Sequence, residues 1–170
     1  MVYYLYRIAA IQLGYILIVM IEEIERMPRV ENEVIIKASV DKVYDFVRQP
    51  SNLPMIWPSL IEVTNEQLLP NGGYSYRWMY KMAGIHLAGT GKCIEIVPNF
   101  LLTSENTGPI NSTVTFTFRS KGTLTRVTLT IDYQVPFPLL GRLAEISIVK
   151  MNDKEAELIL DNLRITFEES

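Results

Sequence analysis

The middle of the chain alternates between apolar and polar residues with a period of two. Six such segments cover residues 60–69, 73–82, 85–97, 100–106, 112–119 and 123–134. This period places alternate side chains on opposite faces of an extended strand, as in a sheet with one buried face. The separators are dipeptides that favour tight turns: Asn71-Gly72, Ala83-Gly84, Pro98-Asn99, Gly108-Pro109 and Lys121-Gly122. The pattern therefore predicts six consecutive antiparallel strands.

The residues before this region predict one more strand and two short helices. Val34, Ile35 and Ile36 indicate a first strand over residues 31–38, after which the hydroxyl of Ser39 can cap a helix. Three prolines then divide the chain into a short second helix and a turn near Trp57: Pro50, Pro54 and Pro58.

The residues after it, from 139 to 167, have a helical period. One apolar stripe contains Val149, Ala156, Leu160, Leu163 and Phe167. Asn152 and Asp153 interrupt the stripe, and three interpretations stay open: a second helix start with Glu155 as capping partner, a solvent-facing turn, or polar groups toward the sheet. Together the elements predict an α+β fold. A curved seven-stranded antiparallel sheet wraps around a long C-terminal helix, with two short helices after the first strand.

Aromatic residues occupy every second position of the strand over residues 73–82: Tyr74, Tyr76, Trp78 and Tyr80. If Ala83-Gly84 is a two-residue turn, Met82 pairs with Ile85. The four rings then stand beside Cys93, Gly91, Gly89 and Leu87 in that order. Two interpretations follow. Either the rings pack over the glycines and complete a core, or the glycines leave room for an aromatic cavity.

The next hairpin is expected to have the same two faces. A turn at Lys121-Gly122 pairs Phe116 with Val127 and Val114 with Leu129 on the inside, and leaves Thr115 and Thr128 outside. Glu95 interrupts the pattern, because simple alternation would place its carboxylate inside. A β-bulge that returns Ile94 and Ile96 to the inside is the favoured explanation.

Composition excludes several function classes. The formal net charge of −3 and the pI near 5.3 argue against a nucleic-acid partner. One cysteine and one histidine rule out an internal disulfide and a His/Cys zinc cluster, and no cofactor is predicted. A single cysteine fits a reducing compartment, so we expect a cytoplasmic protein unless the N-terminus associates with a membrane.

Residues 1–27 form a separate apolar segment. Residues from Val2 to Ile21 are apolar except for Arg7 and Gln12, but the uninterrupted stretch is shorter than the ~20 residues that span a bilayer. Three interpretations stay open: a membrane anchor, a helix packed on the domain or another subunit, or an over-extended start before Met27. We expect membrane association or self-association through residues 2–21.

Most of the chain resembles the START-like (SRPBCC, helix-grip) superfamily, in particular its polyketide cyclase/dehydrase and lipid-transport branch. The matching stretches lie within residues 30–168: VENEVIIKASVDKVYDFVRQPSNLPMIWP, GKCIEIVPNFLLTSE, GTLTRVTLTIDYQVPFPLLGRL and LDNLRITFEE. The resemblance implies a ligand-binding domain over residues 28–170, with a deep cavity between sheet and C-terminal helix that takes lipids, sterols, polyketides or other apolar ligands. It carries over no catalytic motif.

The expected ligand-binding residues are those that register and resemblance place around this cavity. They are Trp57, Tyr74, Tyr76, Trp78, Tyr80, Leu87, Gly89, Gly91, Phe116, Phe118 and Tyr133. Three other sequence features give weaker indications of function. Gly89-Thr90-Gly91-Lys92 lacks the first glycine of a phosphate loop. His86 is expected outside beside Lys81, and Cys93 is expected to be an inert core thiol.

Three hypotheses about function follow. The first is a non-catalytic binding or carrier protein for an apolar ligand that contains a ring or an acyl chain. The second is a cyclase, dehydratase or hydrolase acting in the same cavity, with Glu95, Asp153, Tyr74 or Tyr133 as the acid or base. The third is a protein-interaction module with an exposed apolar patch.

Overall fold

The structure is a computed structural model that describes residues 29–82, 84–134 and 148–168. The strands are β1 (Arg29–Ile36), β2 (Leu60–Leu68), β3 (Tyr74–Met82), β4 (Ile85–Val97), β5 (Leu101–Thr107), β6 (Asn111–Lys121) and β7 (Leu124–Gln134). The helices are α2 (Val40–Arg48), the 3-10 turn η1 (Pro50–Asn52), α3 (Leu53–Ile56) and α5 (Ile148–Glu168). The apolar segment over residues 1–27 lies outside the described residues, as do residues 135–147.

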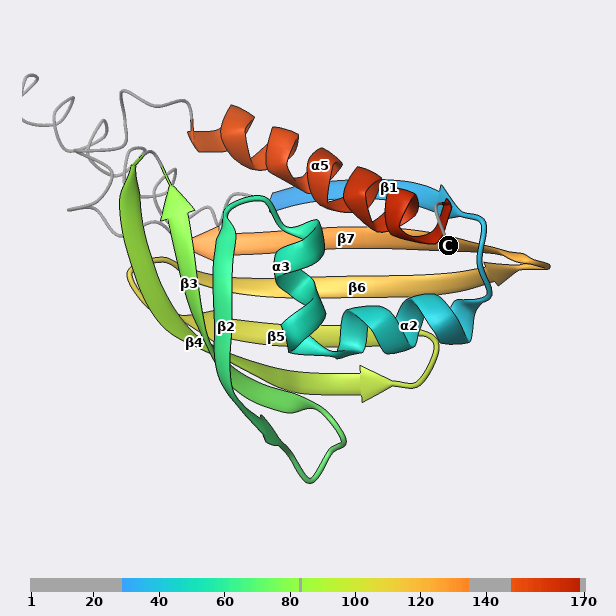
Figure 1. Ribbon diagram of the computed structural model, residues 1–170, viewed down its shortest axis with the longest axis horizontal. Helices are drawn as coiled ribbons and strands as arrows, with labels where there is room; N and C mark the ends of the chain where they lie inside the picture. The colour runs from blue at the N-terminus through green and yellow to red at the C-terminus, as the bar shows by residue number, and fades with distance from the viewer. Residues whose placement is uncertain (1–28, 83, 135–147, 169–170) are drawn as a thin grey trace, which may run out of the picture.

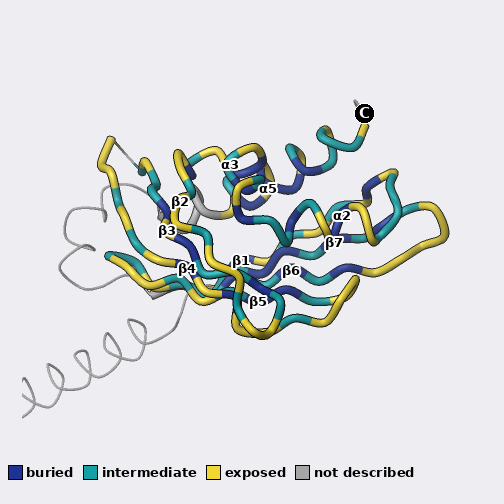
Figure 2. Tube along the Cα trace, turned by 60° about the horizontal axis from the view of Figure 1, so that its bottom comes forward, coloured by how far each residue is buried: buried dark blue, intermediate teal, exposed yellow. Residues whose placement is uncertain are grey.

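The seven strands form one antiparallel sheet in the order β1-β7-β6-β5-β4-β3-β2. The first strand pairs with the last, so β1 and β2 form the two edges. Figure 1 shows the sheet curving, with α2, α3 and α5 on one face, and Figure 2 shows buried segments both in the strands and in the helices. The expected helix-grip architecture, with two short helices after the first strand, is confirmed.

The long C-terminal helix closes the core through one face. Ala156, Ile159 and Leu163 have no exposed surface, and Phe167 packs at the edge of the core against Phe46. The helix runs without a break from Ile148 to Glu168, so two of the three open interpretations are wrong, the second helix start and the turn at Asn152-Asp153. Asp153 is exposed, and a polar residue that faces solvent does not interrupt the backbone hydrogen bonds of a helix.

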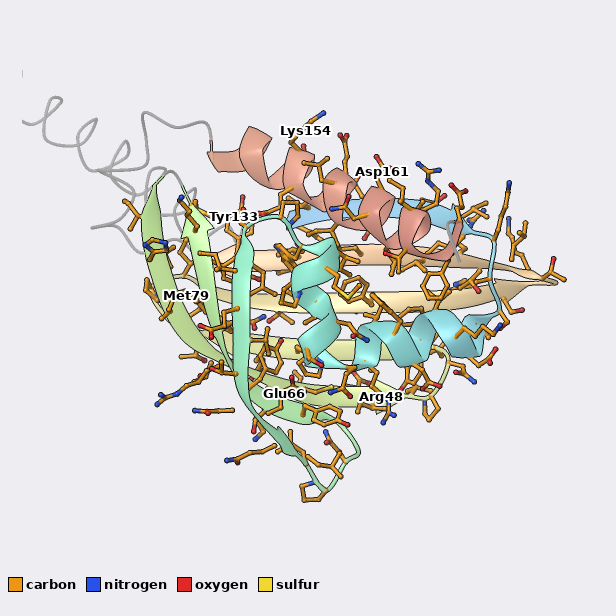
Figure 3. The ribbon with its side chains drawn as sticks, in the orientation of Figure 1. Arg48, Glu66, Met79, Tyr133, Lys154 and Asp161 are labelled. Atoms are coloured by element: carbon orange, nitrogen blue, oxygen red, sulfur yellow. The ribbon has the colours of Figure 1, made fainter. Side chains whose placement is uncertain are left out.

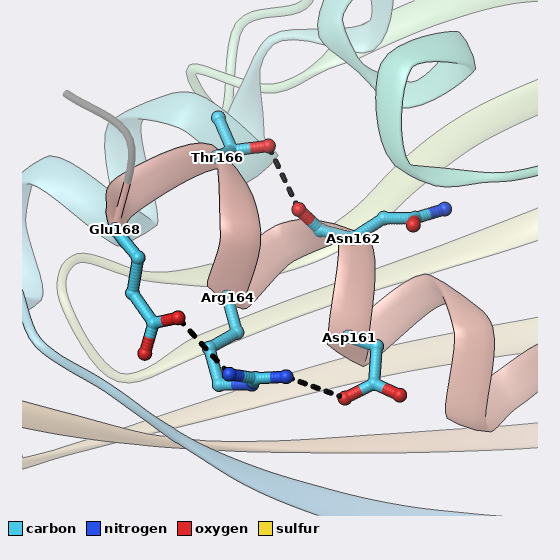
Figure 4. A network of polar contacts seen from close by, with 5 residues as sticks. All are labelled: Asp161, Asn162, Arg164, Thr166 and Glu168. Carbon is cyan, nitrogen blue, oxygen red and sulfur yellow. Dashed lines mark hydrogen bonds and ion pairs between the residues drawn. The ribbon is translucent and has the colours of Figure 1, made fainter.

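Two hydrogen bonds tie α5 to the segment that follows α2. The backbone N–H of Ser59 donates to Oε1 of Glu155 at 3.1 Å, and Nδ2 of Asn162 donates to the carbonyl of Ile56 at 3.0 Å. On the outer side of α5, Arg164 bridges Asp161 and Glu168 (Figure 4). The inner contacts fix the position of α3, and with it the side chain of Trp57, relative to the sheet.

Ser39 is the N-cap residue of α2, as predicted, but its hydroxyl does not cap the helix. The hydroxyl interacts with the carboxylate of Asp41 and lowers the pKa of that group. The sequence therefore predicted the N-cap position of α2 correctly, but not the hydrogen-bond partner of the Ser39 hydroxyl.

The two hairpin registers differ in how well the sequence predicted them. In β3–β4, Met82 pairs with Ile85, Trp78 with Gly89 and Tyr76 with Gly91, as predicted. In β6–β7 the turn residues are 122 and 123, because Lys121 pairs with Leu124 and Gly122 has a φ of +67°. Phe116 therefore faces Leu129 and Val114 faces Ile131, two positions from the predicted partners. A shift of two leaves every side chain on its predicted face.

A register shift between Cys93 and Glu95 confirms the predicted bulge in β4. Glu95 is exposed and Ile96 packs against the core. Ile94, however, is 42% exposed, so the prediction that it returns inward is wrong. The unpaired residue of the bulge instead points outward with Glu95, and Cys93 and Ile96 keep their inward positions on either side.

None of the helices in the described ranges is long and apolar enough to cross a membrane. The expectation for residues 2–21 lies outside those ranges.

Candidate functional site

The main cavity lies between the sheet, α3 and α5, where β7 ends and α5 begins. It encloses about 90 Å³ and is partly open to solvent. Its walls are predominantly apolar and come from every strand from β3 to β7 and from α5: Trp57, Trp78, Tyr80, Met82, Leu87, Asn106, Ile110, Ser112, Ile131, Tyr133 and Glu155. Figure 3 labels Tyr133 at this end of the sheet.

Three aromatic rings form one wall, and the ring of Tyr80 contacts the other two. The ring of Tyr80 lies edge-on to Trp78, with centroids 5.0 Å apart, and edge-on to Trp57 at 5.9 Å. Trp78 and Tyr80 share a face because they are two positions apart in β3. Trp57 follows the last residue of α3, where the chain leaves the helix and turns toward β2. Edge-to-face contacts of this kind hold rings in fixed orientations.

The glycines opposite these rings are covered by them. A Cβ at Gly89 would meet the ring of Trp78 and the carbonyl oxygen of Thr107, and a Cβ at Gly91 would meet the ring of Tyr76. The glycines therefore make room for the rings and do not themselves form the cavity. The cavity lies beside the rings, toward β6, β7 and α5. Both interpretations of the β3–β4 pair are therefore correct in part: the rings pack over the glycines, and an aromatic cavity is present next to them.

The structure brings most of the expected ligand-binding residues together. Trp57, Trp78, Tyr80, Leu87 and Tyr133 line the main cavity. Tyr76 and Phe116 join Trp57, Trp78 and Tyr80 around a smaller hollow of about 20 Å³. The remaining four lie away from both linings: Tyr74, Gly89, Gly91 and Phe118. Phe118 is a core residue, stacked on Phe116 and edge-on to Tyr44.

Three polar atoms of the cavity residues are buried without a hydrogen-bond partner among the described residues. They are Nε1 of Trp57, Nε1 of Trp78 and the hydroxyl oxygen of Tyr133. The exposed fractions of these residues are 7%, 6% and 4%. Leaving a buried donor unpaired costs about 1–3 kcal/mol, so three in one place form an unusual arrangement.

Among the described residues of the cavity wall, Glu155 is the one with a charged side chain. Its carboxylate accepts the Ser59 N–H, and its charge helps to raise the pKa of Tyr80, although burial of the phenol is the larger cause. Burial also raises the pKa of Tyr76 to about 12, opposed in part by a hydrogen bond with Ser104. Both phenols are therefore neutral near pH 7 and can act as hydrogen-bond donors.

The other groups considered for chemistry lie elsewhere. Glu95 and Asp153 are exposed, and Tyr74 is half-buried outside the cavity lining. His86 is exposed opposite Lys81, and burial raises the pKa of the Cys93 thiol, which disfavours the reactive thiolate. Within the described residues no group of three or more His, Cys, Asp or Glu side chains could hold a metal ion.

Six lining residues were missed by sequence reasoning: Met82, Asn106, Ile110, Ser112, Ile131 and Glu155. Ser112 pairs with Tyr133, and Ile131 is two positions before Tyr133, so both share its face of the sheet, and the alternation of the two strands was the available signal. Glu155 was considered as a capping partner. Its place beside Ala156 on the buried side of α5 was the available signal.

The family described as "Polyketide cyclase / dehydrase and lipid transport" matches residues 27–168. The chain belongs to this family. The resemblance to its START-like fold is thereby confirmed, and the fold is one that binds hydrophobic ligands. A search of curated proteins found no match.

Several solved structures share the fold. A protein from Thermus thermophilus is 23% identical, with a TM-score of 0.65 over 84% of this chain and 98% of that one. The Zhui aromatase/cyclase from a Streptomyces species is 17% identical, with a TM-score of 0.67 over 84% and 94%. A START superfamily protein from Mycobacterium smegmatis is 16% identical, with a TM-score of 0.64 over 83% and 97%. At these identities the likeness shows the fold alone.

Proposed function

We propose that the protein is a binding or carrier protein for a hydrophobic small molecule, which enters the cavity between sheet and α5. The observation that carries the proposal is the cavity wall itself: contacting aromatic rings, aliphatic side chains and a few fixed polar groups. This composition is typical of small-molecule sites. The family description, which includes lipid transport, supports the same class of ligand.

The size of the cavity limits what it holds. Drug-sized ligands occupy pockets of about 300–1,000 Å³, and this cavity encloses about 90 Å³. It suits one ring or the end of an acyl chain, with the rest of the ligand extending through the open side. Affinity then comes from apolar area removed from water, at roughly 25 cal/mol per Å².

A fluorescence titration of the full-length protein tests the proposal. N-phenyl-1-naphthylamine, a neutral aromatic probe, is expected to bind saturably and to quench the two tryptophans, both of which line the cavity. Tyr80→Ala removes part of the wall and is expected to weaken binding about five- to tenfold. Arg77→Ala is the matched control, because Arg77 is exposed on the other face of the same strand. Non-saturable quenching, or equal loss in both variants, overturns the proposal.

A second candidate is a cyclase or dehydratase acting in the same cavity. It is favoured by one observation, the Glu155 carboxylate close enough to the Tyr80 phenol to act on its pKa, in a cavity that Tyr133 also lines. The Zhui protein of the same fold is an aromatase/cyclase. If this chain closes rings on a poly-β-ketone substrate with loss of water, Glu155→Gln is expected to abolish product while binding of the neutral probe persists. Equal product formation by wild type and variant contradicts a catalytic role for Glu155.

A further inference from the structure

One row of residues across the sheet contains a tryptophan followed by two glycines. Trp78 of β3 pairs with Gly89 of β4. In the β4–β5 register Thr90 pairs with Thr107, and one position further Gly108 lies beside Gly89. Neighbouring strands are about 4.8 Å apart, and residues of one row project from the same face. The indole of Trp78 can therefore extend across two positions that carry no side chain.

Both glycines lie against the same edge of this ring. A Cβ at Gly108 would lie 2.9 Å from Cη2 and 3.0 Å from Cζ2 of Trp78, and a Cβ at Gly89 would meet the same two atoms. Well-packed carbon atoms lie about 3.5–4.0 Å apart, so a methyl group at either position must displace a neighbour. The ring of Trp78, which lines the cavity, therefore depends on both glycines for its position.

The two glycines differ in what a side chain would displace. At Gly89 a Cβ would also meet the backbone carbonyl oxygen of Thr107, which belongs to a paired strand. At Gly108 the nearest atoms are those of the indole, and the carbonyl oxygen of Ala88 is 3.2 Å away. Gly108 is not among the residues with a positive φ, so alanine can adopt its backbone conformation. A methyl group at Gly108 therefore acts mainly on the indole, and a ring pushed away from the sheet moves toward the cavity.

We propose that Gly108 is a positioning residue that determines ligand specificity. By leaving room for the edge of Trp78, it keeps the indole against the sheet and sets the width of the cavity. Because the cavity encloses only about 90 Å³, a displacement of the ring by one methyl group uses a substantial part of that space. Gly108 is not a lining residue and acts through the ring that is. The inference rests on the proposed ligand-binding function and names a residue that decides between ligands of different width.

Two probes with equal numbers of carbon atoms measure this width. The first, 2-phenylethanol, contains a ring, and the second, 1-octanol, is a narrow chain. Each carries one hydroxyl group, so the two differ mainly in shape. Their affinities for the full-length protein are measured by NMR titration. In Gly108→Ala the affinity for 2-phenylethanol is expected to fall about tenfold relative to that for 1-octanol, the effect of a methylene-sized change in an apolar pocket.

Replacing the indole tests whether Gly108 acts through Trp78. Phenylalanine lacks Cζ2 and Cη2 of the indole, the atoms that the methyl group would meet. In a Trp78→Phe background, Gly108→Ala is therefore expected to leave the ratio of the two affinities unchanged. If Gly108→Ala alone is too unstable to bind either probe, the double variant is expected to recover folding and binding. Ala88→Ser, on the exposed face of β4, is the control and should keep the wild-type ratio.

The outcomes separate this inference from the proposed function. An unchanged affinity ratio in Gly108→Ala overturns the role of Gly108 and leaves the ligand site intact. An equal fall of the ratio with and without the indole, or a double variant that does not recover from an unstable single variant, also overturns it. Failure of both probes to bind the wild-type protein overturns the proposed function and this inference together.

Discussion

The two ends of the space between sheet and helices are built from the same strands and differ in how they are filled. At the β6–β7 hairpin end, Phe118 and Val127 pair across the two strands and have almost no exposed surface. At the opposite end, Ser112, Ile131 and Tyr133 of the same two strands line a cavity. Apolar and polar residues alternate in the same way along the whole of β6 and β7. The alternation therefore determines which side chains point toward the helices, and the sizes of those side chains determine where a cavity remains.

The two ends also differ in whether their buried polar groups have hydrogen-bond partners. The hairpin end contains Thr125, which is fully buried and donates to the carbonyl of Ala38 at 2.8 Å. The cavity end contains two indoles and a phenol without protein partners among the described residues. A satisfied polar group stabilises the fold, whereas an unsatisfied one costs stability unless a ligand supplies the partner. The hairpin end is therefore the better satisfied of the two in its polar groups.

The largest expected effect comes from the packed end. Phe118→Ala is expected to lower the free energy of unfolding by about 3–5 kcal/mol, because the lost ring leaves a void among fully buried neighbours. Urea denaturation measures the change. Phe100→Ala is the matched control, since Phe100 is 44% exposed. If Phe118→Ala lowers the free energy of unfolding no more than Phe100→Ala does, the hairpin end is not tightly packed.

Alkaline pH should act on the aromatic wall. Because the folded-state pKa of Tyr76 is raised to about 12 from 10, the folded protein holds this proton more tightly than the unfolded chain. Its contribution to stability is present below pH 10 and is lost as the pH rises toward 12, in total roughly 2–3 kcal/mol. Unfolding free energies measured across this window should fall less steeply for Tyr76→Phe. Identical slopes would contradict the burial of this phenol.

Gly89→Ala tests how the ring of Trp78 is accommodated. The new methyl group would meet that ring and the Thr107 carbonyl, and the expected loss of unfolding free energy is about 1–3 kcal/mol. Binding of N-phenyl-1-naphthylamine should weaken as well, because the ring moves. Ala88→Ser, on the exposed face of the same strand, is the control. If Gly89→Ala changes neither the free energy of unfolding nor probe binding, there is free space between Gly89 and the ring of Trp78.

The smallest expected effect on stability is that of Tyr133→Phe. The hydroxyl has no partner among the described residues, so its removal should change the unfolding free energy by less than about 1 kcal/mol, with a gain as the expected sign. Thermal unfolding in the absence of added ligand measures it. A clear loss of stability would mean that the hydroxyl is hydrogen-bonded in the free protein.

The sequence predicted faces more reliably than it predicted side-chain positions. Register in β3–β4 followed from a two-residue turn, and the two-position error in β6–β7 left Phe116 and Val114 on the inner face. Whether Trp78 covers Gly89 or stands apart from it depends on side-chain torsions, which a period of two does not determine. Glu155 lies at the edge of the apolar stripe of α5, where a helical pattern cannot distinguish a cavity from solvent.

The most direct test of a ligand cavity at this end is to fill it. Ile131 lies on the cavity wall, and Ile131→Trp is expected to occupy the space that the ligand needs. The variant is expected to keep or exceed the wild-type free energy of unfolding and to lose saturable binding of N-phenyl-1-naphthylamine. A stably folded Ile131→Trp protein that binds the probe as tightly as wild type would show that no ligand occupies this cavity.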